Sequence, residues 1–354
     1  MNSVTNPKVS VVIPNYNHAR FLRRRIESVL SQSFQDFEVI LLDDFSTDDS
    51  RSILSEYADD PRVRIEFNQK NSGSPFKQWN KGVALANGEY IWIAESDDYA
   101  DERFLERLVA VLEAEPEAAF AYCRSWRVSA DDRLDGFLDV LHLAALDPTR
   151  WTADYSADGR DECRNYFMAS NFIGNASSVV FRKAIYERVG GADATLRLSA
   201  DWKLWAAMAL TGRVVYLSEP LNYYRFHSET VRGRDTLFEA QAIESLRVVR
   251  WIRDQVSISG SALKKSSKYL SLIWLRPVLN KQVPLERRWA ILRSAMAIDP
   301  RPMRGAVYAI FRLLIAAVRG PIRVYLWHPV MNATRPVRHA LGLRQRTVKP
   351  AVKD

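Results

Sequence analysis

The hydrophobic pattern of the first 125 residues changes repeatedly between the short apolar runs of buried strands and the longer period of amphipathic helices. Apolar runs rich in β-branched residues predict strands over 8–14, 37–44, 62–67, 89–94 and 118–123. Helical patterns lie between them, over about 18–32, 49–58, 77–86 and 101–113. Strands and helices that alternate at this pace predict an α/β fold, a mostly parallel sheet with helices on both faces.

The second half of the chain is less regular. Residues 125–165 hold no strong pattern, and the next clear patterns predict a strand over 177–182 and a helix over 198–212. Residues 213–227 are typical of two extended pieces broken at Pro220, which cannot donate a hydrogen bond to a sheet. Beyond about residue 235 the pattern is helical.

Polar residues gather where three of the predicted strands end. Asn15-Tyr16-Asn17 follows the first strand, Asp43-Asp44 closes the second, and Glu95-Ser96-Asp97-Asp98 follows the fourth. In open α/β sheets, ligands bind beyond the carboxyl ends of the strands. We therefore expect these acids and amides to converge on one edge of the sheet and to form the site.

The acids suggest two kinds of chemistry. Glu95, Asp97 and Asp98 could turn toward one Mg²⁺ or Mn²⁺, which accepts carboxylate oxygens together with diphosphate oxygens. Asp43 and Asp44 could accept hydrogen bonds from a base or from ribose hydroxyls. Simpler roles stay open, because Asp98 alone could cap the following helix and acids in loops often only organise the loop.

These residues carry a resemblance to a known family. The segment VSVVIPNYNHARFLRRRIESVLSQSFQDFEVILLDDFSTDDS, followed by NSG and WNKGVALANGEYIWIAESDDY, resembles glycosyltransferase family 2 proteins with the GT-A fold. The resemblance is continuous over residues 8–122 and sparser to about 230. It implies a GT-A domain over 1–235, with a nucleotide-binding half at about 8–122 and an acceptor half at about 123–235.

The resemblance also implies roles for single residues. Around the nucleotide it implies the residues Pro14, Tyr16, Asn17, Asp43, Asp44 and Ser96. Asp97 would bind a divalent cation, Mn²⁺ or Mg²⁺, and Asp98 beside it would contact the donor. Glu95 stands where the family usually has an aspartate, so the charge is kept on a longer arm, and it is a candidate for contact with the donor sugar.

A second motif lies near residue 200. The family's general base is an acid at the start of a helix in a pattern close to ED-W-x-L-W, and Ala200-Asp201-Trp202-Lys203-Leu204-Trp205 resembles it, with Ala200 in place of the first acid. Asp201 would take the proton of an acceptor hydroxyl while that oxygen attacks the anomeric carbon from behind, which inverts its configuration. Asp201 as a simple helix cap is the alternative.

The sequence Tyr224-Arg225-Phe226-His227 is similar to the family's later YR-x-H element. By this resemblance, His227 would approach the diphosphate or the metal, and Arg225 would offset phosphate charge on the donor. An arginine and a histidine in a loop could otherwise be ordinary surface residues.

Charge separates the chain into two parts. From Ala240 to Asp354 there are 22 Lys and Arg against 5 Asp and Glu, whereas the preceding residues carry an excess of acids. We expect a helical basic region over 236–354 that touches an anionic membrane, with an interfacial amphipathic helix in 302–319, a segment too short and too charged to span. A basic but merely solvated face, or an ordinary buried helix, is the competing interpretation.

These observations together favour an inverting glycosyltransferase of cell-surface polysaccharide synthesis, with a nucleotide-sugar donor, most often a UDP-sugar, and a glycan or lipid-linked acceptor. Two cysteines without metal-ligand spacing and no recognisable signal peptide favour the cytoplasm, at the inner face of the plasma membrane. A G-x-G-x-x-G after the first strand is absent, which disfavours an oxidoreductase, and we expect no nucleic-acid partner. An inactive nucleotide-binding or scaffold protein is the alternative.

Overall fold

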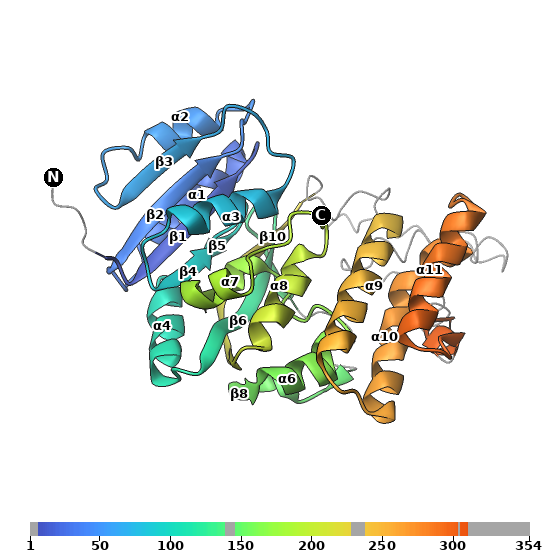
Figure 1. The fold of residues 1–354 in the computed structure, drawn as a ribbon. Coiled ribbons are helices and arrows are strands. Elements are labelled where there is room, and N and C mark those ends of the chain that lie inside the picture. The colour runs from blue at the N-terminus through green and yellow to red at the C-terminus, as the bar shows by residue number, and fades with distance from the viewer. Residues whose placement is uncertain (1–5, 139–145, 228–237, 304, 311–354) are drawn as a thin grey trace, which may run out of the picture.

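A ten-stranded mixed sheet forms the centre of the computed structural model, which describes residues 6–138, 146–227, 238–303 and 305–310 (Figure 1). The strands follow the order β3-β2-β1-β4-β9-β6-β10-β5, with β7 on β6 and β8 on β10. Their bounds are β1 Val9–Asn15, β2 Phe37–Asp43, β3 Val63–Phe67, β4 Tyr90–Ile93, β5 Tyr99–Ala100, β6 Ala118–Ser129, β7 Leu134–Phe137, β8 Tyr155–Asp158, β9 Val179–Arg182 and β10 Arg213–Phe226.

The first four strands are parallel, as their buried apolar runs predict. Helices cover both faces of this part of the sheet. On one face, α1, α2 and α4 pack over β1 in a buried cluster that includes Ile26 and Phe104, and on the other, α3, α7 and α8 pack in a second cluster that includes Trp79 and Trp205. Their bounds are α1 Ala19–Leu30, α2 Ser50–Ser55, α3 Pro75–Leu85, α4 Phe104–Ala114, α7 Lys183–Arg188 and α8 Ala200–Ala209.

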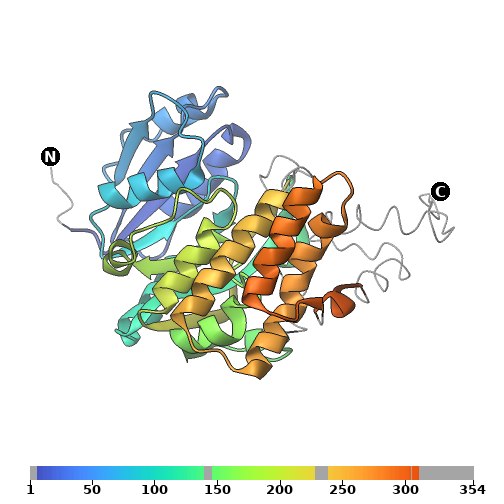
Figure 2. The same cartoon turned by 45° about the vertical axis from the view of Figure 1, so that its right-hand side comes forward.

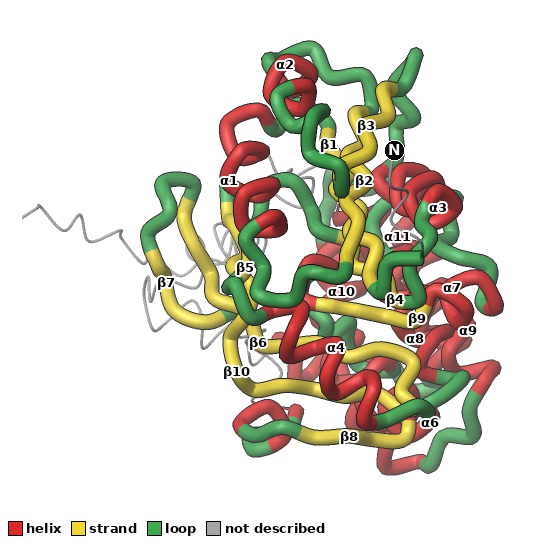
Figure 3. The backbone as a smooth tube through the Cα atoms, turned by 90° about the vertical axis from the view of Figure 1, so that its left-hand side faces the viewer, coloured by secondary structure: helices red, strands yellow, loops and turns green. Residues whose placement is uncertain are grey.

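The sheet changes direction at β9, which is antiparallel to both β4 and β6. Beyond it, β6 and β10 run parallel to each other, and Figure 3 shows β9, β6, β10 and β8 following one another across the lower part of the sheet. The strand β9 thus joins the two halves, and a single sheet carries both.

Several elements differ from the sequence predictions. The two pieces expected around Pro220 are one strand, β10, with register irregularities at Leu217, Pro220 and Asn222 that accommodate the proline. The strand expected over 118–123 continues to Ser129. The strands β5, β7 and β8 were not predicted, because they are short and lie at the margins of the sheet, where no apolar run is needed.

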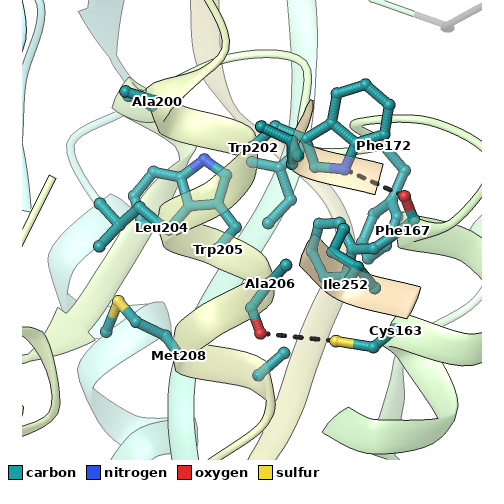
Figure 4. Close-up of a cluster of buried hydrophobic side chains, with 14 of the residues drawn as sticks. Cys163, Phe167, Phe172, Ala200, Trp202, Leu204, Trp205, Ala206, Met208 and Ile252 are labelled. Carbon is teal, nitrogen blue, oxygen red and sulfur yellow. Dashed lines mark hydrogen bonds between the residues drawn. The ribbon is translucent and has the colours of Figure 1, made fainter. Parts of the chain in front are cut away.

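In the described part of the chain, the sheet is followed by α9, α10 and α11, which lie side by side beside α8 and are coloured yellow to orange in Figure 2. They are α9 Phe238–Gln255, α10 Gly260–Leu279 and α11 Leu285–Ile298, so the helical expectation for this region is confirmed where the structure describes it. Their buried residues share one hydrophobic cluster with α8, in which Ile252 meets Phe167 and Trp202 (Figure 4). The expected boundary at residue 235 stays a prediction.

In the described ranges, no helix is both long and apolar enough to cross a membrane. Most of the interfacial helix expected over 302–319 lies outside the described residues. The tryptophans of the ADWKLW motif are both in the core. The Trp202 indole donates to Phe167 O at 3.0 Å and Trp205 is fully buried, so neither forms a sugar-binding surface (Figure 4).

Candidate active site

The three polar loops meet at the carboxyl edge of the parallel strands, as predicted. Asn15 and Asp43 are partners in the register of β1 and β2, and the Asn15 amide donates to Asp43 Oδ1 at 3.2 Å. The third loop joins them through His18, whose Nδ1 lies 2.8 Å from the Ser96 hydroxyl oxygen. Residues that are 78 positions apart in the chain therefore share one site.

Asp43 and Asp44 are buried, and protein groups bind both carboxylates. The Arg51 side chain donates to Asp43 Oδ2 at 2.9 Å. Asp44 Oδ1 accepts the Asn68 amide at 2.6 Å and the Ser72 backbone N–H at 2.8 Å, which holds the loop before α3 against β2. The structure thus gives these acids a loop-organising role, and their contact with a base stays a prediction.

Two aromatic rings are exposed at the same edge. Tyr16 is 47% exposed and Phe45 is 44% exposed, although most large apolar side chains of the sheet half are buried. Asn17 and Phe45 both have a positive φ, 56° and 66°, an uncommon conformation for residues other than glycine. Pro14 lies buried in β1 beneath them. Phe45 was not predicted from the sequence as a site residue, although its neighbour Asp44 was.

The acidic loop after β4 is held by groups from several elements. Glu95 is half-buried, and its Oε1 accepts the Trp79 indole N–H at 2.7 Å. Ser96 is buried beneath His18. Asp97 is also half-buried, and its Oδ2 lies 3.0 Å from His227 Nε2. The loop therefore presents Glu95 and Asp97 at its partly open side.

Asp98 has a different position from its neighbours. It is 1% exposed, and its Oδ2 accepts Asn175 Nδ2 at 2.6 Å and the Ser177 hydroxyl at 2.7 Å. Its Oδ1 accepts the Arg225 backbone N–H at 2.9 Å. Asp98 is therefore neither a cap of α4 nor turned to an open surface. These contacts let it position the acidic loop, and its contact with the donor stays a prediction.

Arg225 and His227 are buried, so the surface interpretation is wrong for both. The Arg225 guanidinium donates to Asp97 O at 2.7 Å and Ser129 O at 3.0 Å and pairs with Asp132. With these partners it supports the backbone of the acidic loop, and the predicted contact with donor phosphate would have to displace them.

A fully buried arginine, Arg25, lies under the same loop. Its Nε donates to Glu95 O at 2.8 Å, and its Nη2 lies 4.0 Å from Asp98 Oδ2. Burial lowers the pKa of Arg25 to about 10, which leaves it charged near neutral pH. The sequence did not single it out because it lies in the apolar stripe of α1, and a basic residue in such a stripe was the available signal.

The carboxylates of this loop oppose one another's ionisation. Burial and the charges of Asp97 and Asp98 raise the pKa of Glu95 to about 8. Burial and Asp97 raise the pKa of Asp98 to about 6. Burial is the largest single influence on Asp97 too and acts to raise its pKa, but the hydrogen bond with His227, the electrostatic interactions with His18 and His227 and a backbone hydrogen bond together hold the pKa of Asp97 below its usual value. Additional positive charge at this point would relieve the repulsion.

The residues at this point fit a divalent cation. His18, Asp97 and His227 each offer one ligand atom, and these atoms lie within 4.8 Å of one another. A cavity of about 420 Å³ opens beside the two histidines. The predicted metal residues Asp97 and His227 are thus adjacent, whereas His18 was not predicted.

Asp201 lies in the first turn of α8 and is largely buried. The Asn171 amide donates to its Oδ2 at 3.1 Å. Helix α8 contacts the acidic loop indirectly. The ring of Trp205, on α8, has its centroid 6.3 Å from that of Trp79, and the Trp79 indole donates to Glu95. The N-terminus of a helix favours a negatively charged group, which suits a carboxylate that accepts a proton.

The segment before α8 is held by the C-terminal helices. Both oxygens of Glu244, on α9, accept backbone N–H groups, from Arg197 at 2.9 Å, Leu198 at 2.7 Å and Ser199 at 3.0 Å. A single carboxylate thus binds three successive peptide groups directly before Asp201. Nothing in the sequence around Glu244 indicated this contact.

A mixed sheet of this order, with an acidic loop at its carboxyl edge, is the arrangement of the GT-A glycosyltransferases. The family model for glycosyl transferase family 2 matches residues 10–188, half of the chain, and the chain belongs to this family. It is therefore a glycosyltransferase, and the predictions of family, fold and enzyme class are confirmed.

Relatives with curated descriptions cover much of the chain. An uncharacterised glycosyltransferase of Nostoc sp. is 29% identical over 304 residues, 81% of this chain and 82% of that protein. The putative teichuronic acid biosynthesis glycosyltransferase TuaG of Bacillus subtilis is 27% identical over 269 residues, 73% of this chain and 97% of that protein. The family's relatives thus include proteins of bacterial cell-wall polysaccharide synthesis.

Solved structures share the fold at low sequence identity. Staphylococcus aureus TarS residues 1–349 has a TM-score of 0.64 and 18% identity, covering 96% of this chain and 93% of that one. A mannosyltransferase of Pyrobaculum calidifontis, solved with GDP-Man and Mn²⁺, has a TM-score of 0.55 and 17% identity, covering 97% and 90%. The likeness extends over nearly the whole length, including the C-terminal helices.

Proposed function

We propose that this chain is an inverting, metal-dependent glycosyltransferase that uses a nucleotide-sugar donor, a UDP-sugar first, and transfers the sugar to a glycan or lipid-linked acceptor in cell-surface polysaccharide synthesis. The observation that carries the proposal is the cluster of Asp97 and His227 at the sheet edge that also bears the nucleotide loops. TarS has been solved with UDP and with UDP-GlcNAc, which supports a UDP-sugar.

The nucleotide would lie over the loops after β1 and β2. Tyr16 and Phe45 offer exposed rings on which a base can stack, and aromatic stacking tolerates any base. Asn17 and Asp43 fix the backbone of these loops. The diphosphate would then reach Ser96 and the side of the acidic loop that Asp97 and His227 form.

Transfer requires one proton acceptor and one way to stabilise the leaving group. Asp201 accepts the proton of the acceptor hydroxyl, the acceptor oxygen forms a bond to the anomeric carbon, and the bond to the diphosphate oxygen breaks on the opposite side. A divalent cation held by Asp97 and His227 would offset the negative charge of the leaving nucleoside diphosphate. Glu95 is the remaining carboxylate on the open side, a candidate for the sugar hydroxyls.

The membrane contact in this proposal rests on the end of α10, on α11 and on the described residues that follow it. Most of the exposed large apolar side chains lie in this region: Leu279, Leu285, Trp289, Met296, Met303, Val307 and Ile310. Leu285, Trp289 and Met296 fall on one stripe of α11, and this part of the chain is strongly basic. An apolar stripe with basic neighbours suits the surface of an anionic membrane, where a lipid-linked acceptor would be found.

The test is donor hydrolysis over a panel of nucleotide sugars with Mn²⁺ or Mg²⁺ and then with EDTA. We expect release of a nucleoside diphosphate from one donor, loss of the reaction with EDTA, and a fall of about 10²-fold or more in Asp97→Ala, because the charge of the leaving group is no longer offset. Asp201→Asn should keep nucleotide binding by calorimetry but lose transfer to an acceptor.

Asp59→Ala, at an exposed acid far from the site, is the matched control and should behave as the unchanged chain. If the unchanged chain neither bound a nucleotide nor hydrolysed any donor, the proposed chemistry would be wrong. Full activity in Asp97→Ala would remove the role of the acidic loop.

A further inference from the structure

His18 lies beside the two residues already assigned to the metal. It precedes α1, and its ring packs edge-on against the His227 ring with centroids 5.7 Å apart. One nitrogen of each histidine and one oxygen of Asp97 lie within 4.8 Å of one another, close enough to share one ion after small side-chain rotations. Three elements, the loop after β1, the acidic loop and the end of β10, thus meet at a single point.

The backbone around His18 is fixed in several ways. Asn17, directly before it, has a φ of 56°, and its Oδ1 accepts the Thr47 backbone N–H at 2.8 Å. The His18 carbonyl oxygen accepts the backbone N–H groups of Phe21 and Leu22 at the start of α1. The position of the ring is therefore set by the fold and not by a flexible loop.

The hydrogen bond of His18 Nδ1 with Ser96 determines which nitrogen faces the site. Histidines that bind metals commonly use one ring nitrogen for the ion and the other for a hydrogen bond that fixes the ring and its tautomer. With Nδ1 at 2.8 Å from the Ser96 oxygen, Nε2 is the nitrogen for a ligand. The hydrogen bond with Ser96 would then hold the His18 ring in the orientation that binds the metal.

We propose that His18 is a third protein ligand of the cation, so that two imidazoles and the Asp97 carboxylate form the site. The proposal deepens the function proposed above and rests on its metal dependence. Imidazole nitrogen binds first-row transition-metal ions such as Co²⁺ and Zn²⁺ well and Mn²⁺ more weakly, whereas Mg²⁺ prefers oxygen ligands. The site therefore selects a transition-metal ion over Mg²⁺, and leaves its other coordination positions to donor oxygens on the side of the cavity.

The contrasting possibility is that His18 only packs on Phe21 and His227. Its ring contacts with both, at 6.3 Å and 5.7 Å between centroids, would also be made by a side chain without a ligand nitrogen. A measurement of the number of nitrogen ligands separates these two roles, because packing alone leaves that number unchanged.

The experiment uses the full chain and Mn²⁺ alone, followed by electron paramagnetic resonance, with and without UDP. Titration of the free Mn²⁺ signal gives the affinity, competition with Mg²⁺ gives the selectivity, and electron spin echo modulation counts the coordinating ¹⁴N nuclei. We expect two histidine nitrogens in the unchanged chain and one in His18→Ala. The affinity for Mn²⁺ should fall about 10- to 100-fold and the preference over Mg²⁺ should shrink.

Three further variants make the result specific. His227→Ala should also leave one nitrogen. Arg23→Ala, on the exposed face of α1, should keep both nitrogens and the affinity for Mn²⁺. Thermal unfolding without metal checks that each variant is folded. His18→Phe keeps a ring for packing. If His18 is a ligand, this variant should lose one Mn²⁺-bound nitrogen, as the alanine variant does.

An unchanged nitrogen count and Mn²⁺ affinity in His18→Ala would overturn the inference. Because the readout is metal binding, it is independent of turnover. A chain with two nitrogens on Mn²⁺ that neither bound a nucleotide nor hydrolysed a donor would contradict the proposed function alone. Metal-dependent hydrolysis with one nitrogen would contradict this inference alone.

Discussion

Gly190 and Gly191, in the turn after α7, both need a conformation that other residues avoid. Their φ values are 83° and 73°, in the left-handed region. Their surroundings differ, because a Cβ on Gly191 would lie 2.7 Å from Asn80 Oδ1 while a Cβ on Gly190 would meet no atom within 4 Å. Asn80 also accepts the Ala192 backbone N–H at 3.0 Å, so this turn fixes the path toward α8 against α3.

This pair of glycines allows a matched test of strain against steric overlap. Gly190→Ala should lower the free energy of unfolding by about 1 kcal/mol, the cost of a left-handed alanine. Gly191→Ala should cost about 2–3 kcal/mol, since the overlap with Asn80 is added. Urea unfolding of both variants measures the difference, and equal losses would show that the turn moves away from Asn80 without penalty.

Site residues were predictable to the extent that a motif marked them. The sequence pointed to the polar groups that follow β1, β2 and β4, since loops at the ends of parallel strands meet by topology alone. It could not show that Asp98 is enclosed by Asn175 and Ser177, because such contacts depend on how β9 docks. The sequence did not identify Arg25 and His18 as site residues either, because their partners Glu95 and Ser96 follow about 70 positions or more later and no local pattern indicates these contacts.

Among the elements, the buried strands and helices of the first half were predicted well, because their apolar runs and periods are strong. Helix α2 is shorter than expected. The segment around Pro220 forms one strand, β10, because pairing with β6 outweighs the tendency of proline to interrupt a strand. The strand β8 has no apolar pattern and forms only because β10 offers it an edge. Weak local preference leaves such elements to the rest of the fold.

Helix α9 has a function that its position in sequence does not indicate, because Glu244 holds the backbone before α8. Removing its carboxylate in Glu244→Ala leaves three N–H groups to find water. We expect a loss of about 1.5–3 kcal/mol in the free energy of unfolding, typical of hydrogen bonds to a charged group. Amide hydrogen exchange at residues 197–199 should become faster.

Glu239→Ala is the matched control on the same helix. Its partner is the mostly exposed Arg287, so the variant should lose no more than about 1 kcal/mol and leave exchange at 197–199 unchanged. If both variants had the same effect, Glu244 would contribute only general stability to α9 and would not position the segment before Asp201.

The excess of basic residues lies in the part of the chain after residue 240. Most of the exposed large apolar side chains that the structure describes lie there as well. If the C-terminal helices contact a membrane, the full chain should co-sediment with vesicles that contain phosphatidylglycerol and much less with neutral phosphatidylcholine vesicles. Binding should weaken as salt rises, because the basic residues are screened. The double variant Trp289→Ser, Met296→Ser should bind several-fold less.

Leu134→Ser is the control, since Leu134 is an exposed apolar residue on β7, in the other part of the molecule. Equal binding by the double variant and the unchanged chain would exclude the stripe on α11 as the contact. Failure of the unchanged chain to bind either kind of vesicle would favour a protein partner or the chain's own residues 311–354 as the cover of this stripe.

The partners of Asp98 have a consequence for the order in which activity arises during synthesis. They belong to residues 175, 177 and 225, which follow Asp98 by 77, 79 and 127 positions, so the acidic loop acquires its last support only after all of these residues have been synthesised. A nascent chain that has completed only the first strands can form nucleotide loops but not a supported acidic loop. A truncated chain that ends before residue 225 should therefore lack part of the support of the acidic loop.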